Sequence, residues 1–494
     1  MGCTTATQLA LTLFATMAVL RGEFTDLENF IRVLGSLNTN TSAVNYLNGS
    51  VYLRQPGAPI VKIFNYEGYN INRKQRRPDG TFLSLSREFV VYRQPNTSQI
   101  MQVWMNPISG RPNEVFTVMN DPVNAHLSDP SPNFAAPYNR PAYRIYNSDI
   151  VLEYRNPLQP DAYPRYSAGP WYDSVELFGF FANYTLLTGS SLDSLPMTGT
   201  WMRKSEFLPW MELGTTPGEL YYTTLAWKCM DGLACVAEDI MNIIKENYPK
   251  YLKAPSTEEV PNETSWTVFK KVIDQRRQAG LPDIIIPQVN TSTHVRDMVY
   301  DVDPRVLNVL YKWPLNIRFN GTAWSEIPGK QTVPLYNLRG NVGVDLEPIP
   351  EGGGWRLQLD GNFYLLNHTT NEPFKQFLNP ITGRVNNVTY IQEVAVDMVF
   401  PKDSFYSMDI YSSEVVGLIG AQGMDDGAPG GTGNWSVNMF NAIFPWEELA
   451  KNTTVTTATF YGIFSTFASW PVWMEMTDIP GNIVQKLFFS NGDI

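Results

Sequence analysis

The residues best suited to acid–base chemistry are two glutamates in similar local sequences. Glu212 and Glu475 each end a Trp-Met-Glu triplet, which begins at Trp210 and at Trp473. If each triplet lies on a strand, residues two positions apart share a face, so each glutamate would accompany its tryptophan into an apolar interior. Burial raises the pKa of a carboxyl group and fits it for proton transfer. The alternative is an outward, solvated carboxylate, because neighbours along a strand face opposite ways.

Other polar and aromatic residues could complete a site around such a carboxyl group. His126 is the one histidine considered for acid–base work, because His294 lies near a domain boundary and His368 lies within a glycosylation triplet. Arg155 could add a second polar group. Aromatic side chains can line an apolar pocket, although most of them pack cores. The candidates for substrate contact are Tyr66, Trp104, Trp201, Trp210 and Trp473.

Several common catalytic motifs are absent from the sequence. It has no Gly-x-Ser-x-Gly elbow, no His-Glu-x-x-His motif and no Gly-x-x-x-x-Gly-Lys phosphate loop. With 3 His and 3 Cys, a transition-metal site is not expected. The net charge of -11 argues against a nucleic-acid partner, which needs a basic face. We therefore expect an activity without metal or cofactor, or no activity.

The sequence predicts a secreted or lumenal glycoprotein. Gln8 to Leu20 is an apolar run too short to span a bilayer, which favours a cleavable signal peptide over residues 1–20; a buried helix is the alternative. Asn-x-Ser/Thr triplets are spread over both halves, and chance would give roughly five. No stable membrane insertion is expected. The triplets begin at Asn40, Asn48, Asn96, Asn183, Asn262, Asn290, Asn320, Asn367, Asn387, Asn434 and Asn452.

The cysteines fit the same compartment. Removal of the signal peptide would remove Cys3 and leave Cys229 and Cys235, which bracket a short Met-Asp-Gly-Leu-Ala segment. An oxidising compartment would allow the two to pair, so we predict a local disulfide. A zinc site is not expected from two cysteines without a nearby histidine.

The chain contains an internal repeat. Four blocks recur in the same order at an almost constant spacing, which indicates a tandem duplication. The block with Asn-Pro-Ile-Ser/Thr-Gly-Arg is typical of a tight turn between two strands. The matched segments are Phe64 to Gly68 with Tyr336 to Gly340, Trp104 to Arg111 with Phe377 to Arg384, Ser174 to Phe181 with Ser436 to Phe444, and the two Trp-Met-Glu triplets.

Within each copy, short β-branched or aromatic segments punctuated by Gly, Pro and Asn predict antiparallel strands. We expect a mainly β protein, β-rich α+β, with two barrel-like or curved-sheet domains. The expected strands are Val51 to Phe64, Phe82 to Tyr92, Ile100 to Met105 and Val115 to Met119. Two long loops, Asp121 to Asn147 and Gly420 to Gly433, could cover a pocket mouth. The basic run Arg73 to Arg77 is expected to be a solvated turn.

The two copies are unequal. The first continues into two helical patterns, Ala234 to Leu252 and a second that starts near Asn262 and stops at Gly280, whereas the second copy has neither. The boundary is expected between Gly280 and Val295. The predicted domains are therefore a first β-rich domain with added helices over residues 21–280 and a second, related domain over residues 281–494.

Several motifs of the first copy resemble a family found in bacteria and fungi that is known only as a domain of unknown function. The resemblance covers roughly residues 25–275 and implies no reaction. The motifs are Phe64 to Asn70, Trp104 to Arg111, Asn156 to Pro164, Trp201 to Gly218 and Asn262 to Lys271.

The leader, the glycosylation triplets, the length and the lack of a cofactor motif together resemble the glycosylated hetero-Diels–Alderases of fungal tropolone-sesquiterpenoid pathways. That resemblance implies a cofactor-independent enzyme of secondary metabolism. Such an enzyme dehydrates a tropolone to a reactive quinone methide and guides its addition to a humulene-type alkene, so its partners are small apolar molecules of polyketide and terpene type.

Two alternatives stay open. One is a secreted carrier of terpenoid or lipid ligands without catalysis, which would use the same kind of pocket. The other is a protein in which only the first copy has a site and the second copy is a structural partner. Whether the site lies within one domain or between the two, and whether the protein forms a homodimer, the sequence leaves undecided.

Overall fold

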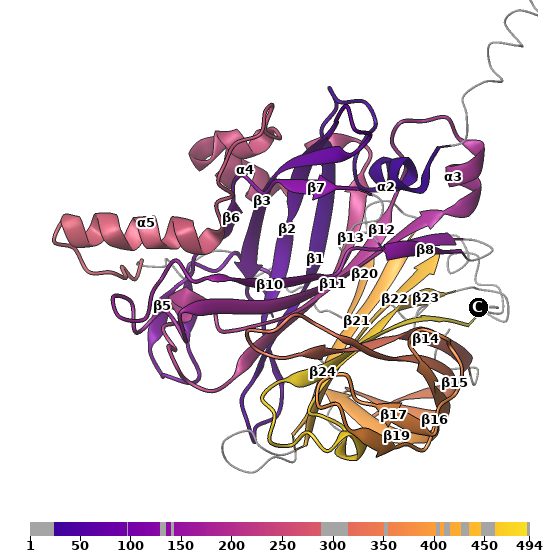
Figure 1. Ribbon diagram of the computed structural model, residues 1–494. Helices are drawn as coiled ribbons and strands as arrows, with labels where there is room; N and C mark the ends of the chain where they lie inside the picture. Colours follow the sequence, from indigo (N-terminus) through magenta and orange to yellow (C-terminus); the bar gives the residue numbers. More distant parts are fainter. Residues whose placement is uncertain are drawn as a thin grey trace, which may run out of the picture.

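The described residues form two large curved antiparallel sheets, two two-stranded sheets and a few helices (Figure 1). The computed structural model describes residues 24–95, 97–128, 135–139, 143–287, 315–349, 354–401, 406–409, 415–425, 434–445 and 460–491. The expected mainly β fold with two related sheets is confirmed. The features predicted outside the described residues are the signal peptide, Cys3, His294, the second part of the domain boundary and the triplet residues Asn96, Asn290 and Asn452.

The first sheet belongs to the N-terminal half of the chain. Its strand order is β6-β3-β2-β1-β13-β12-β11-β9-β8, with β10 paired to β11 and β7 paired to β3. No pairing joins β6 to β8 in the described residues, so the sheet is open and curved rather than a closed barrel. The strands are β1 (Ala43–Arg54), β2 (Val61–Arg76), β3 (Phe82–Arg93), β6 (Val118–Asn120), β7 (Ala125–Leu127), β8 (Ala135–Asn139), β9 (Tyr143–Asn147), β10 (Ile150–Arg155), β11 (Trp171–Asn183), β12 (Thr198–Ser205) and β13 (Glu219–Cys229).

The second sheet has the corresponding order, β19-β16-β15-β14-β24-β23-β22-β21-β20. In both sheets the first long strand pairs with the last, β1 with β13 and β14 with β24. The strands are β14 (Leu315–Glu326), β15 (Pro334–Pro348), β16 (Gly354–Asn367), β19 (Ile391–Pro401), β20 (Tyr406–Asp409), β21 (Val415–Asp425), β22 (Trp435–Pro445), β23 (Tyr461–Ala468) and β24 (Asn482–Ser490).

The repeated Asn-Pro-Ile turn has the same hydrogen bonds in both copies. It joins β4 (Val103–Met105) to β5 (Pro112–Glu114), and β17 (Gln376–Leu378) to β18 (Val385–Asn387). In the first copy the Asn106 Oδ1 accepts from the Ile108 N–H at 2.9 Å, and in the second the Asn379 Oδ1 accepts from the Ile381 N–H at 2.9 Å. The local motif therefore specifies the same turn twice.

Glycines allow the sheets to curve tightly at matching places. A Cβ on Gly49 of β1 would lie 2.1 Å from the Thr223 carbonyl oxygen, and one on Gly321 of β14 would lie 1.9 Å from that of Lys486. Only glycine permits so close an approach of neighbouring backbones. The Asn48 and Asn320 triplets each contain one of these glycines. The close approach of the backbones therefore explains the glycine in both Asn-Gly-Ser/Thr sequences.

Helices accompany mainly the first sheet. The two helices expected near the end of the first copy are present as α4 and α5, and Cys229 and Cys235 form the expected disulfide. The helical segments are α2 (Asp26–Leu34), α3 (Tyr184–Gly189), η2 (Gly232–Cys235), α4 (Glu238–Asn247), η3 (Pro249–Leu252) and α5 (Ser265–Gln278).

The expected strand placement of the Trp-Met-Glu triplets is wrong. They form the 3-10 turns η1 (Pro209–Met211) and η5 (Val472–Met474). Glu212 and Glu475 follow these turns with φ of 55° and 52°, in the left-handed region, and their amides cap the turn. The alternation of strand faces therefore does not apply to them.

Other local expectations also need correction. Val51 to Phe64 is not one strand, because the chain turns between β1 and β2. The segment from Asp121 to Asn147 includes β7, β8 and β9, and the Gly-rich segment begins within β21, so neither is one long loop. Short runs of polar and small residues resemble loops even where neighbouring strands recruit them into a sheet.

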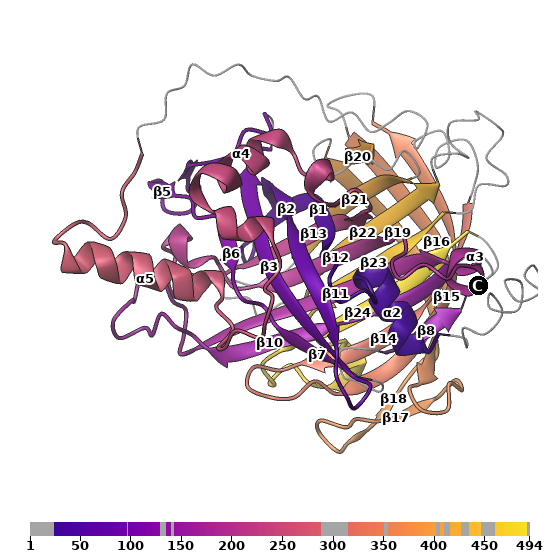
Figure 2. The same cartoon turned by 90° about the horizontal axis from the view of Figure 1, so that it is seen from above.

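The two sheets pack against each other through one face of each (Figures 1 and 2). One apolar cluster combines residues of both, among them Leu177, Tyr221 and Leu225 with Val437 and Ile463. We call these the outer faces and the opposite faces the inner faces. The contact is close, since a Cβ at Gly179 would lie 2.1 Å from the Ile463 Cδ1.

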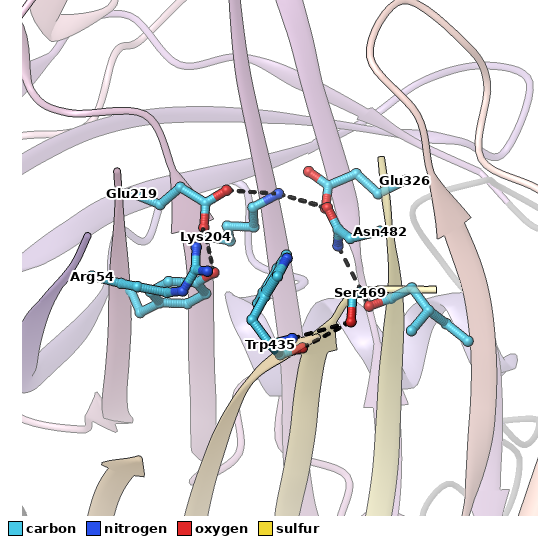
Figure 3. Close-up of polar contacts among 9 residues, drawn as sticks. Arg54, Lys204, Glu219, Glu326, Trp435, Ser469 and Asn482 are labelled. Atoms are coloured by element: carbon cyan, nitrogen blue, oxygen red, sulfur yellow. Dashed lines mark hydrogen bonds and ion pairs between the residues drawn. The ribbon is translucent and has the colours of Figure 1, made fainter. Parts of the chain in front are cut away.

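Polar groups of opposite charge are buried at the edge of this interface (Figure 3). Lys204 of β12 lies 3.0 Å from Glu326 and 2.8 Å from the Asn482 Oδ1 of the second domain, and 3.6 Å from Glu219 of its own. Burial alone would lower the pKa of Lys204, but Glu326 and Glu219 outweigh that effect and raise it. Lys204 thus stays charged and joins the domains.

We expect Lys204→Met to destabilise the protein by about 3–5 kcal/mol, because it leaves Glu326 buried without its cation and Glu219 with Arg54 alone. Urea unfolding would measure the change, with Lys245→Met on the exposed surface of α4 as the control. A loss no larger than that of the control would contradict a stabilising role for this cluster.

Candidate functional site

A cavity of about 460 Å³ lies on the inner face of the first sheet. Side chains from β1, β2, β3, β6, β7 and β10 to β13 line it, and the first residues of α5 close one side. Figure 2 shows α5 alongside the first sheet and away from the second. The site therefore belongs to the first domain alone.

Polar residues form cross-strand rows on this inner face. Asn70 on β2 pairs with Asn45 on β1 and with Glu88 on β3, and Glu88 pairs in turn with Asn120 on β6. All four line the cavity. Because side chains alternate along strands, residues two and four positions away continue the same face.

Glu88 is the carboxyl group best suited to proton transfer in the cavity. Burial raises its pKa to about 6, against the effect of the Asn120 amide, which donates to Oε2 at 2.6 Å. The Asn120 Oδ1 accepts from the Ser265 N–H at 2.7 Å, which fixes the amide orientation. The first residue of α5 thus positions the partner of Glu88.

A buried ion pair lies on β11 and β12. Arg203 Nη1 lies 3.2 Å from Glu176 Oε1, and Arg203 also donates to the Tyr172 hydroxyl. Burial raises the pKa of Glu176, while Arg203 lowers it. The pair brings a fixed cation to the cavity wall, where it can polarise an oxygen atom of a bound molecule.

Aromatic rings surround one end of the cavity. Tyr66 lies 5.6 Å from Tyr92 and 5.5 Å from Trp201, and Trp201 lies 5.6 Å from Tyr222, measured between ring centroids. Burial raises the pKa of Tyr66 and Tyr92 well above the ordinary value, so both keep their hydroxyl protons. This end offers flat apolar surface with neutral hydrogen-bonding groups.

The other end contains Lys74, whose expected place in a solvated turn is wrong. Arg73 to Arg76 continue β2, and Lys74 is 4% exposed. Its ammonium donates to the Ser84 Oγ at 2.7 Å. Lys74 lies near the end of β2 on the face that points into the cavity. A run of basic residues in the sequence does not show which of them takes this face.

The second domain provides an internal comparison, because its strands have the same register. Each Asn, Ser, Lys and Glu on β1 to β3 that lines the cavity has a counterpart of Val, Ile, Leu or Gly in the second domain. The pairs are Asn45 and Ile317, Asn70 and Val342, Asn72 and Val344, Lys74 and Leu346, Ser84 and Leu357, Ser86 and Leu359, and Glu88 and Gly361. The fold therefore does not require polar groups there.

The ion pair also has an uncharged counterpart. Asn438 and Thr466 occupy the register positions of Glu176 and Arg203, and the Thr466 hydroxyl donates to the Asn438 Oδ1 at 2.9 Å. A neutral pair satisfies this position of the fold. The fold therefore does not require the charges of Glu176 and Arg203 in the first domain.

Phenylalanines fill the inner face of the second sheet. Phe319 and Phe489 take the register positions of Leu47 and Ala226, which line the cavity of the first sheet. The Phe319 ring lies 5.5 Å from Phe363 and 5.7 Å from Phe489. Smaller side chains in the first copy leave the corresponding space open.

The carboxyl and imidazole candidates from the sequence lie outside this cavity. The Glu212 carboxylate accepts from the Asn113 amide and pairs with Arg165, whereas Glu475 is exposed. His126 lies on β7 with its side chain 64% exposed, 3.5 Å from Glu258. Arg155 is exposed at the end of β10.

Two of the aromatic candidates, Tyr66 and Trp201, line the cavity. Trp104 and Trp210 pack with Phe64 in the core beneath the Asn-Pro-Ile turn, and Trp473 packs at the corresponding place in the second domain. The repeated tryptophans therefore serve the repeated turn.

The asparagines of the glycosylation triplets differ in exposure. Asn48 and Asn320 are partly buried within strands. The Asn183 side chain caps α3, and the Asn262 side chain bonds the backbone of Asn124. The exposed asparagines are Asn40, Asn183, Asn262, Asn367, Asn387 and Asn434.

Four residues of the cavity are not among the site residues predicted from the sequence: Glu88, Glu176, Arg203 and Lys74. A signal was present, because continuing the Phe64 to Gly68 match along the chain would have set Asn70 and Lys74 against Val342 and Leu346. Where a polar residue of one copy aligns with an apolar residue of the other, the fold itself does not require the polar group.

Among the described residues, no group of three or more His, Cys, Asp and Glu side chains is arranged to hold a metal ion. None of the helices in the described part of the chain is both long and apolar enough to cross a membrane.

Comparison with solved structures gives likenesses at very low identity. A protein of unknown function from the DUF3598 family of Nostoc punctiforme is 9% identical with a TM-score of 0.25, over 94% of this chain and 98% of that chain. A putative outer membrane protein of Bacteroides fragilis is 7% identical, with a TM-score of 0.16 over 91% and 96%. OccK5 of Pseudomonas aeruginosa is 7% identical, with a TM-score of 0.15 over 92% and 98%.

At the level of sequence, no curated protein matches the chain. Residues 40–273 match the family described as "Protein of unknown function (DUF1838)". The matched segment runs from just before β1 into α5 and so includes the lining of the cavity except Leu34. The first domain is therefore similar to a family of uncharacterised proteins.

Proposed function

We propose that this protein is a secretory-pathway enzyme that needs no cofactor and works in the cavity of the first domain. The observation that carries the proposal is the contrast between the two copies. Burying Glu88, Glu176, Arg203 and Lys74 costs stability, and the second domain folds in the same way without them. Such groups persist at sites of binding and catalysis.

The reaction we propose is a hetero-Diels–Alder cycloaddition in secondary metabolism. A hydroxymethyl or hemiketal tropolone would lose water to give a quinone methide, which then adds to a humulene-type alkene. The rings of Tyr66, Tyr92 and Trp201 offer flat apolar surface on which two partners can be held together. Holding two reactants in a reactive orientation can itself supply a large part of the acceleration.

Glu88 is the proposed proton donor. With its pKa raised to about 6 by burial, a large fraction is protonated in a mildly acidic compartment. Its proton would pass to the leaving hydroxyl group as the C–O bond breaks. The tropolone hydroxyl would ionise and its oxygen become the carbonyl of the quinone methide, so one water molecule leaves, and Glu88 would regain its proton from solvent.

A carrier of terpenoid or lipid ligands is the second candidate. One wall of the cavity is apolar, with Ile150 and Leu152 on β10 and Phe178 and Phe180 on β11. A carrier would need this wall but no proton donor, so the two functions differ in the role of Glu88.

We expect Glu88→Gln to lower the cycloaddition rate by about 10²- to 10⁴-fold while ligand affinity is kept, because the amide cannot donate the same proton. The wild-type rate should fall as pH rises through about 6, where the acid form of Glu88 is lost, and this dependence should vanish in the variant. Chromatography with mass detection of the adduct and its stereoisomers measures both.

Glu212→Gln is the matched comparison, because that carboxylate lies outside the cavity. A rate loss in Glu212→Gln without one in Glu88→Gln would reject the proposed donor. A product mixture identical to that formed without protein would reject the reaction.

Ala226→Phe should close the cavity, because Phe489 occupies the same register position in the second domain. We expect at least about a tenfold loss of affinity for terpenoid ligands, measured by calorimetry, with the fold retained at a cost of about 1–3 kcal/mol for the extra volume. Ala226→Ser serves as the small control. Unchanged affinity in Ala226→Phe would place the ligand elsewhere.

A further inference from the structure

Lys74 is a buried cation that neither the fold nor the proposed proton transfer uses. It lines the cavity together with Asn72, Ser84 and Ser86. The Ser84 hydroxyl is its hydrogen-bond acceptor, and among the described residues no carboxylate pairs with its ammonium. A buried ammonium without a counter-ion is costly.

Lys74 and Arg32 both act electrostatically on Lys228, and Lys228 and Arg32 are cations with structural tasks. Lys228 of β13 donates to the carbonyl oxygens of Arg32 and Val33 at 2.7 and 3.2 Å, which satisfies the end of α2. Arg32 of α2 donates to the Leu187 carbonyl oxygen at 3.0 Å, in the segment around α3. Both bond backbone oxygens and neither lines the cavity, so Lys74 is the one of these three cations that faces it. Arg203 lines the cavity too, but it is already paired with Glu176.

Without a counter-ion, the buried Lys74 amine holds its proton less strongly than an exposed lysine does. Burial lowers the pKa of Lys74 to about 7. Burial also lowers the pKa of Lys228, and the charges of Lys74 and Arg32 add to that effect. An anion beside Lys74 would reverse this effect and hold the proton on the nitrogen. Leu346 occupies the matching position in the second domain, so folding does not require the lysine.

We propose that the cavity takes a ligand with an acidic oxygen, a carboxylate or an acidic enol, and that this oxygen anion pairs with Lys74. Ser84, Ser86 and Asn72 can complete its hydrogen bonds. The inference concerns the cavity of the proposed function and deepens it, because the hydroxyl of a tropolone is such an acidic enol.

The register then orients the ligand. Three cross-strand pairs of β2 and β3 follow one another at intervals of four residues. They are Lys74 with Ser84, Asn70 with Glu88, and Tyr66 with Tyr92. At a rise of about 3.3 Å per residue, Glu88 lies roughly 13 Å from either end. A ligand anchored at Lys74 directs its apolar body past Glu88 toward the aromatic rings.

The test compares naphthalene-2-carboxylate with naphthalene-2-methanol, which share the ring system and differ in the acidic group. Calorimetry at pH 8 should give at least about a tenfold preference of the wild-type protein for the acid. Titrations in two buffers of different ionisation heat should show uptake of up to one proton with the acid and none with the alcohol, because Lys74 becomes charged on binding.

Lys74→Met should remove both the preference and the proton uptake while affinity for the alcohol stays within about threefold, which also shows that the variant is folded. Lys253→Met, an exposed lysine outside the cavity, is the matched control and should behave as the wild type. A preference that survives Lys74→Met, or equal affinity of the wild type for the two probes without proton uptake, would overturn the inference.

These binding measurements need no turnover. If the acid preference depends on Lys74 but no adduct forms, the anion site stands and the proposed reaction fails. If Glu88-dependent turnover is seen without any preference for the acid, the reaction stands and the anion site fails.

Discussion

The burial of the two outer faces against each other is the constraint on which the rest of the molecule depends. Each sheet curves because glycines such as Gly49 and Gly321 let neighbouring backbones approach closely. A curved sheet has two faces to cover, and the apolar cluster that joins Leu177 and Tyr221 to Val437 covers the outer face of both at once. Because the two outer faces bury each other's apolar side chains, the residues of the inner faces can differ between the two copies.

That divergence gives the copies different physical roles. The second sheet fills its inner face with Phe319, Phe363 and Phe489, which adds apolar burial to the whole protein. The first keeps smaller residues such as Ala226 there and carries charged groups beside the resulting cavity. A filled copy can offset the cost of a hollow one, because the buried interface and Lys204 couple the two domains.

Inside the cavity, burial acts on each ionisable group according to its neighbours. Within the described part of the chain the Asn120 amide is the hydrogen-bond donor to Glu88, and burial raises the pKa of Glu88. Lys74 has a single hydroxyl, and its pKa falls. Arg203 keeps its charge because Glu176 and the Tyr172 hydroxyl lie beside it. One cavity therefore combines a carboxyl group of raised pKa, an amine of lowered pKa and a fixed cation along a single sheet face.

The sequence by itself determined what local signals encode: the duplication, the strand-rich class, the Asn106 turn, the α5 helix and the Cys229–Cys235 pair. These depend on residues close together in the chain, whose turn, capping and spacing preferences act locally. Only the tertiary structure decided that Glu212 ends a turn and that Lys74 and Glu88 face a cavity. Whether a side chain is buried depends on which strands lie beside it and in what register, and a shift of one residue would turn Lys74 outward.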